Sequence, residues 1–203
     1  MPNAKKRTTS EKYGSDPLPD SAIRPYLANY LSTWTMKNGT AVTIRPIHSE
    51  DEPLMVKFHQ TLSDRSVYLR YFCSLSLSRR VAHERLVRIC FGNHDREMVL
   101  VVQRTDSGTG GLQIIAVGRM NKLRAGNEAQ VAVLVSDQYQ KLGLGHELLR
   151  RVVEIARDEK LRRVSAEILP DNLAMQVIMK RLGFCVHMSK DLRSVRAVLD
   201  LFS

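Results

Sequence analysis

The chain has 203 residues, of which 43% are hydrophobic and 26% are charged, a mixture typical of one globular domain and unlike a disordered chain or a coiled coil. The apolar runs at 98–102 and 131–135 are strand-sized and exclude a membrane-spanning helix, while three widely spaced cysteines without CxxC exclude a disulfide framework and favour the reducing cytoplasm. The net charge of +10 predicts an anionic partner, which includes nucleic acid, anionic lipid and a phosphorylated cofactor.

The first forty residues differ in composition from the rest of the chain. They begin with basic residues, continue with Gly, Ser, Asp and Pro, and lack a periodic apolar pattern. Such a segment does not bury enough apolar surface to offset the entropy of ordering it. We therefore expect residues 1–40 to be a tail or linker, in which the single tryptophan, Trp34, packs against the main body, and residues 41–203 to form the domain.

The domain reads as alternating strands and helices, which predicts an α/β fold without internal repeats. The predicted elements are, in chain order, a strand at 41–47, a helix that begins with a capping box of Ser49 and Glu52, short helices at 63–72 and 78–89, and strands at 97–104 and 112–120. There follow a strand at 128–135, a glycine-containing loop, a helix built on 148–156, a strand at 163–169, a helix capped by Asn172, and strands at 184–188 and 195–202.

The loop between the strand at 128–135 and the following helix is the element that carries chemistry. It consists of Gln140, Lys141, Leu142, Gly143, Leu144 and Gly145. Free N–H groups at a helix start, together with the positive end of the helix dipole, favour a phosphate or pyrophosphate there. The pattern Q-x-x-G-x-G is neither GxGxxG nor GxxxxGK[ST], and a short glycine loop by itself is more often a tight turn than a ligand site.

A resemblance to a known family comes from this loop and a second segment. The Q-x-x-G-x-G loop after a strand, with Asn172 and Leu182-Gly183-Phe184 further on, is similar to the GNAT superfamily of acyltransferases over residues 40–203. More narrowly, the chain resembles the acetyltransferase module of bacterial protein lysine acetyltransferases, in which the module is often fused to an acyl-CoA-synthetase-like region. The segments that carry this narrower resemblance are 23–26, 38–40, 44–47, 50–54, 68–72 and 95–98.

The resemblance implies the GNAT fold, with a mixed central sheet, flanking helices, and two central strands, 128–135 and 163–169, that splay apart around the pantetheine arm of acetyl-CoA. The arm's amides would pair with the exposed backbone of Val133, Leu134 and Val135, and the glycine loop would hold the pyrophosphate. His146, in the first turn of the helix, and Asn172 are further candidates for cofactor contact, although each is also typical of an ordinary helix residue or an N-cap.

Acetyl transfer to a lysine, with its pKa near 10.4, requires a base. The glutamate that family members often carry in the central strand corresponds to Gln130. Glu128, two residues earlier and on the same strand face, is the first candidate base, ahead of Glu167 on the neighbouring strand. Both are also compatible with solvated surface carboxylates.

The tyrosine that usually acts as general acid in the superfamily corresponds to Met179, which carries no proton, and we assign no such role to Tyr139. A thiolate leaves readily enough that solvent protonates it.

The sequence therefore predicts an acetyl-CoA-dependent N-acetyltransferase that transfers acetyl directly to a lysine amine, on a protein substrate. The alternative is a non-catalytic acyl-CoA-binding sensor, because Gln130 and Met179 stand at the usual base and acid positions. A nucleic-acid module has the charge in its favour but no recognised motif, so no nucleic-acid partner is expected. Six histidines without ligand spacing predict no metal site, and the oligomeric state stays open.

Overall fold

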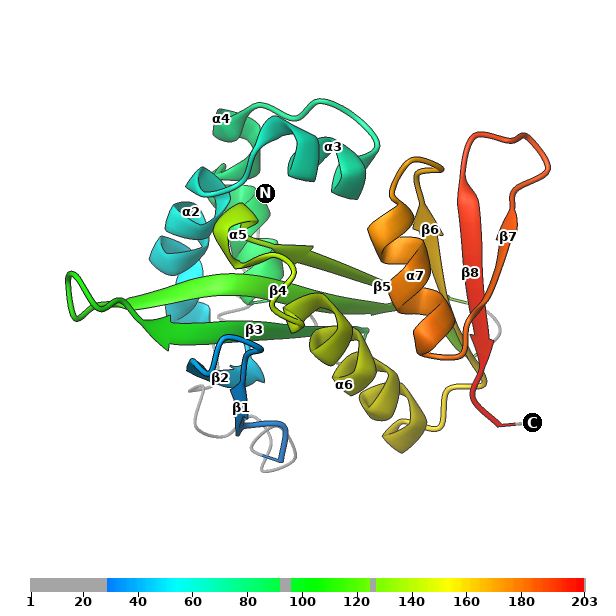
Figure 1. Ribbon diagram of the computed structural model, residues 1–203, viewed down its shortest axis with the longest axis horizontal. Coiled ribbons are helices and arrows are strands. Elements are labelled where there is room, and N and C mark those ends of the chain that lie inside the picture. Colours follow the sequence, from blue (N-terminus) through cyan, green and yellow to red (C-terminus); the bar gives the residue numbers. More distant parts are fainter. Residues whose placement is uncertain (1–28, 92–95, 125–126, 203) are drawn as a thin grey trace, which may run out of the picture.

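The computed structural model describes residues 29–91, 96–124 and 127–202. Within these ranges eight strands form one mixed sheet in the order β1-β2-β3-β4-β5-β6-β8-β7 (Figure 1). The strands are β1 (Ser32–Thr35), β2 (Ala41–Pro46), β3 (Glu97–Thr105), β4 (Leu112–Lys122), β5 (Glu128–Val135), β6 (Arg163–Ile168), β7 (Cys185–Met188) and β8 (Val195–Asp200).

The pairing of β5 with β6 is the irregular feature of this sheet. All other neighbouring strands are antiparallel, whereas β5 and β6 run parallel and pair only from Glu128 with Arg163 to Gln130 with Ser165. Beyond that point the two strands separate. The splay that the resemblance implies is therefore present, and it opens toward the carboxyl ends of both strands.

Helices cover both faces of the sheet (Figure 1). They are α2 (Glu52–Gln60), α3 (Asp64–Tyr71), α4 (Leu77–Arg80), α5 (His83–Cys90), α6 (Leu144–Asp158) and α7 (Leu173–Arg181). The helices α2 to α5 lie on one face, and α6 lies on the other. No helix in the described ranges is long and apolar enough to cross a bilayer.

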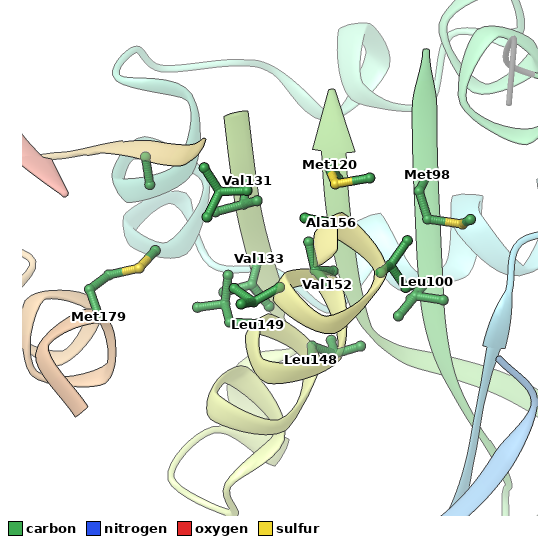
Figure 2. Close-up of a cluster of buried hydrophobic side chains, with 14 of the residues drawn as sticks. Met98, Leu100, Met120, Val131, Val133, Leu148, Leu149, Val152, Ala156 and Met179 are labelled. Atoms are coloured by element: carbon green, nitrogen blue, oxygen red, sulfur yellow. The ribbon is translucent and has the colours of Figure 1, made fainter. Parts of the chain in front are cut away.

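Each face has its own hydrophobic core, because the side chains of each strand alternate between the faces. On the α6 face, Leu148, Leu149, Val152 and Ala156 recur at helical spacing and pack against β3, β4 and β5. Figure 2 shows these residues facing Met98, Leu100, Met120, Val131 and Val133, with Met179 extending from α7 toward β5. The opposite core contains Met55, Phe58, Leu86, Val99, Val101 and Leu134.

The strand and helix order expected from periodicity is confirmed from residue 41 onward, with two local differences. The expected helix at 78–89 is two helices, α4 and α5, because Ala82 between them has a non-helical backbone, with φ −56° and ψ 127°. The expected capping box is shifted by one residue, since the His48 N–H donates to Asp51 Oδ2 at 2.8 Å and a 3₁₀ turn at Ser49–Asp51 precedes α2.

The expected boundary after residue 40 needs a correction. Strand β1 pairs with β2 over Ser32 to Thr35, so the sheet begins inside the segment that we expected to be a tail. A four-residue edge strand with Trp34 between two threonines has too few apolar residues to give a periodic signal. Residues 1–28, which include most of the expected tail and the 23–26 segment, lie outside the described residues, as does Asp95.

Candidate active site

The separation of β5 from β6 creates a cavity of about 470 Å³. Its walls come from the last turn of α3, from β4, β5 and β6, and from the start of α7. The lining residues are Leu69, Arg70, Tyr71, Phe72, Arg119, Asn121, Gln130, Val131, Ala132, Val133, Ala166, Glu167, Ile168, Asn172, Met175 and Met179. The two splayed strands thus form two walls of this cavity.

The backbone of β5 offers hydrogen bonds to this space. The N–H of Ser136 donates to the Ile115 carbonyl on the β4 side, so by strand alternation the polar groups of Val133 and Val135 face the β6 side, where β5 has no strand partner. Leu134 instead faces β4 and turns its side chain into the second core. Of the three residues expected to meet the pantetheine arm, Val133 and Val135 have the suitable orientation.

The glycine loop ends directly on the first turn of α6. Gly143 is the N-cap of α6 with φ +94°, a conformation that a residue with a side chain rarely adopts. The first α6 bond of the loop runs from the Glu147 N–H to the Gly143 carbonyl. The N–H groups of Leu144, Gly145 and His146 precede this bond and have no acceptor within the helix, which is the arrangement that binds an anion. The Leu144 side chain is buried, so only its backbone is available.

Gly145 leaves a small space between β5 and α7 beside the glycine loop. A Cβ atom at this position would lie 3.5 Å from Ile178 of α7, 3.9 Å from Val135 and 4.0 Å from Val133. The gap between β5 and α7 at the head of the loop is therefore open because residue 145 has no side chain. This space lies next to the N-terminus of α6, on the side of Val135 and Val133.

The β1–β2 hairpin packs on the outside of the same loop. The Lys37 N–H donates to the Leu142 carbonyl at 3.2 Å, and the ring of Trp34 lies 3.1 Å from where a Gly143 Cβ would stand. Trp34 is therefore an anchor, as expected, and its contact is the glycine loop. Lys141, exposed and at φ +64°, and Lys37 add two cations to this end of the site.

A second contact ties the loop to α3. Asp137, at the start of the loop, accepts hydrogen bonds from the Ser63 N–H, the Ser63 hydroxyl and the Ser66 hydroxyl at 2.7–2.8 Å. Although burial raises the pKa of Asp137, these bonds outweigh it and hold the pKa below its ordinary value. The Gln140 side chain donates to Ser66 at 2.9 Å and to the Val135 carbonyl at 3.3 Å, so it braces the loop between α3 and β5.

The two positions carried over from the second family segment lie at the start and middle of α7. Asn172 is the N-cap, as expected: its Oδ1 accepts from the Met175 N–H at 3.2 Å, and the residue also lines the cavity. Met179 is 1% exposed and lines the same cavity from the middle of α7. Tyr139 lies elsewhere, where its hydroxyl accepts from Arg104 at 2.7 Å and from Gln113 at 3.2 Å.

The three candidate catalytic side chains share one face of the sheet but differ in surroundings. Glu128 lies at the paired end of β5, outside the cavity lining, and its Oε1 accepts from Arg162 at 2.8 Å and Arg163 at 3.2 Å. Gln130 and Glu167 both line the cavity. Glu167 is exposed and has no ion-pair partner among the residues that the structure describes.

Several cavity residues were not singled out as site residues from the sequence. They are Arg70 and Tyr71 from α3 and Arg119 and Asn121 from β4. Arg70 and Tyr71 lie in the 68–72 segment that resembles the lysine acetyltransferase module, so that resemblance could have indicated them. Arg119 and Asn121 reach the cavity because the register between β4 and β5 places them opposite Ala132 and Gln130. Within the described ranges no group of His, Cys, Asp and Glu is arranged to hold a metal ion.

Comparison with known proteins identifies the family. The family model for the acetyltransferase (GNAT) domain matches residues 41–185. Acetyltransferase Pat of Mycolicibacterium smegmatis is 29% identical over 169 residues, which are 82% of this chain and 47% of that protein, so this chain spans about half the length of that relative.

The chain is also similar to solved structures. The crystal structure of the GNAT domain of S. lividans PAT is 29% identical, with a TM-score of 0.75 over 87% of this chain and 99% of that domain. Mycobacterium smegmatis RimJ in complex with CoA-disulfide has a TM-score of 0.64 over 84% of this chain and 86% of that one, and at 14% identity it shows the fold alone. Because the family model covers well over half of the chain, the chain belongs to the acetyltransferase (GNAT) family, and it resembles the GNAT domain of the bacterial Pat lysine acetyltransferases.

Proposed function

We propose that this GNAT acetyltransferase transfers the acetyl group of acetyl-CoA directly to the side-chain amine of a lysine in a protein substrate. The observation that carries the proposal is the divergence of β5 from β6 after Gln130 and Ser165, which opens a cavity beside unpaired β5 backbone. The similarity to Pat supports lysine as the acceptor.

In this proposal the chain's backbone holds the donor. The N–H groups at the start of α6 bind the pyrophosphate, and Val135 and Val133 pair with the amides of the arm as an added strand does. Acetyl-CoA supplies an activated acyl group on a thiol leaving group. A thiolate with a pKa near 8.5 departs without a side-chain acid, so a methionine at position 179 is compatible with the chemistry. A β5 backbone N–H near Val133 then faces the carbonyl oxygen that becomes negative during attack.

We assign the base to Glu167 in preference to Glu128. A base must reach the amine that enters the cavity, and Glu167 lines that cavity, whereas the Glu128 carboxylate already accepts hydrogen bonds from two arginines at the closed end of the strand pair. Glu167 also has no ion-pair partner among the described residues, so its oxygens are available to the incoming ammonium group. Gln130, on the same wall, is suited to hydrogen bonding with the substrate but not to accepting a proton.

The test compares two charge-neutralising variants of equal size. Acetylation of a panel of lysine-containing peptides and proteins is measured by mass spectrometry, with CoA affinity measured in parallel by calorimetry. Glu167→Gln should lower kcat/KM by about 100-fold with little change in CoA affinity. Glu128→Gln is the matched control and should retain turnover near the wild-type level.

Two outcomes would contradict this proposal. Equal activity of the Glu167→Gln variant and the wild type would remove Glu167 as the base. Tight CoA binding by the wild type without transfer to any lysine or other amine would instead favour the acyl-CoA sensor.

A further inference from the structure

The cavity wall contributed by α3 carries a cationic side chain. Arg70 stands in the last turn of α3, half-buried, and lines the cavity. No carboxylate of the described residues forms an ion pair with it, whereas its neighbour Arg119 is paired with Glu97. Burial lowers the pKa of Arg70, and the nearby Arg119 and Arg85 lower it further, against an opposing effect of Tyr71.

The local packing keeps this guanidinium at the cavity wall. The guanidinium carbons of Arg70 and Arg85 lie 5.1 Å and 4.9 Å from the centre of the Tyr71 ring, so both cations make cation–π contacts with one tyrosine. An arginine does not deprotonate near neutral pH, and a half-buried charge beside like charges is unfavourable unless an anion joins it. Such a cluster is therefore preorganised for an anionic group that the described part of the chain does not itself provide.

The position of the cluster identifies where that anion must come from. Arg119 is the β4 partner of Ala132, one residue from Val133, whose backbone faces the cofactor channel. Arg70 lines the same cavity as Glu167. Because neither Glu167 nor any other carboxylate of the described residues forms an ion pair with Arg70, an anion that binds there is carried by one of the two molecules that meet in the cavity. The pyrophosphate is not this anion, since the glycine loop lies at the other end of the β5 segment.

We propose that Arg70 forms a carboxylate-binding subsite within the acyl-transfer cavity. A carboxylate fits because the planar guanidinium donates two parallel hydrogen bonds to it. It has two possible sources: an acidic side chain next to the acceptor lysine, or the terminal carboxylate of a dicarboxylic acyl chain on CoA. The proposal rests on the proposed function, since it places both substrates in this cavity.

The experiment measures binding without turnover, using the 203-residue chain. In the first arm, the CoA-saturated protein is titrated with a peptide whose lysine is flanked by glutamates, and with the same peptide carrying glutamines. In the second arm, succinyl-CoA is compared with butyryl-CoA, which has the same number of acyl carbons and a methyl group in place of the carboxylate. Each titration is repeated with Arg70→Gln and with Arg88→Gln, which removes an exposed charge from α5 outside the cavity.

We expect the wild type to bind the carboxylate-bearing ligand about tenfold or more tightly in at least one arm, because hydrogen bonds between charged groups contribute that much to affinity. The arm that responds identifies the source. Arg70→Gln should abolish the preference and Arg88→Gln should keep it. Arg70→Lys, which retains the charge but not the planar fork, should keep part of it, and unchanged binding of CoA itself reports that each variant is folded.

The absence of any preference in both arms, or a preference that survives in Arg70→Gln, would overturn the subsite. These results are separable from failure of the proposed function. A protein that prefers the carboxylate but transfers no acetyl group would contradict only the transfer, and one that acetylates lysine without a carboxylate preference would contradict only the subsite.

Discussion

His59 makes the stability of this domain depend on pH in a direction that the structure fixes. The residue is 1% exposed in α2, and neither ring nitrogen has a hydrogen-bond partner among the described residues. Burial, with contributions from Arg85 and Arg80, lowers its pKa from 6.5 to about 4. The neutral ring is therefore the form that the core accepts.

The size of the effect follows from proton linkage. Between pH 6.5 and pH 4 the unfolded chain binds a proton at His59 and the folded chain does not, so the free energy of unfolding falls as the pH falls through this window. The contribution of the neutral His59 ring to the free energy of unfolding is fully present above about pH 7, and about 2 kcal/mol of it is lost between pH 8 and pH 5. Over the same interval other groups titrate, so a variant is needed to isolate this residue.

Urea unfolding at pH 8 and pH 5 gives the loss of stability on acidification for each protein, and the difference between the losses of the wild type and the variant measures the effect of His59. His59→Leu should lose about 2 kcal/mol less stability than the wild type on acidification, whatever the substitution does to packing at pH 8. His187→Leu, at an exposed position on β7, is the control and should follow the wild type. If His59→Leu and the wild type lose equal stability, the buried neutral histidine is not the source of the pH dependence.

Two further predictions concern the cofactor channel and the thiols. Gly145→Leu should weaken CoA binding by about 100-fold or more in a calorimetric titration, while Gly145→Ala should weaken it far less. A methyl group at residue 145 would only touch Ile178 at 3.5 Å, whereas a leucine side chain would fill the gap beside β5. Equal affinities of the two variants would exclude a path of the pantetheine arm past Gly145. With a thiol reagent at pH 8, the exposed Cys73 and Cys185 should react quickly and Cys90 only after unfolding, since burial raises the pKa of the Cys90 thiol to about 12; three equally fast thiols would contradict this.

Periodicity predicted the framework of the fold because each long strand and helix here buries one face. The alternation of β5 and the helical spacing of α6 are read directly from Val131, Val133, Leu148 and Val152, which form one core. The missed strand β1 shows the limit of this signal. Its stability comes from pairing with β2 and from Trp34 lying against the glycine loop, and neither contact leaves a periodic pattern in four residues.

The features of the candidate site that depend on local sequence are predictable from the sequence, whereas those that depend on the register between strands are not. The glycine loop and the N-cap Asn172 are local features, and the structure has both at helix starts. Strand alternation also put Glu128 and Glu167 on one face. What separates these two carboxylates is the residue at which β5 and β6 stop pairing, together with the arginines that reach Glu128, and both depend on contacts between segments more than thirty residues apart.

The net charge of +10 has a more specific meaning once the partners of the arginines are known. Arg150 and Arg151 pair with Glu147 and Glu154 within α6, and Arg163 pairs with Asp200 and Glu128, so these cations are balanced inside the fold. Lys37 and Lys141 beside the glycine loop and Arg70 in the cavity, by contrast, form no ion pair with a carboxylate of the described residues. A uniformly basic surface would attract any polyanion, whereas positive charge at both ends of one channel favours a ligand that carries phosphates at one end and meets a carboxylate at the other.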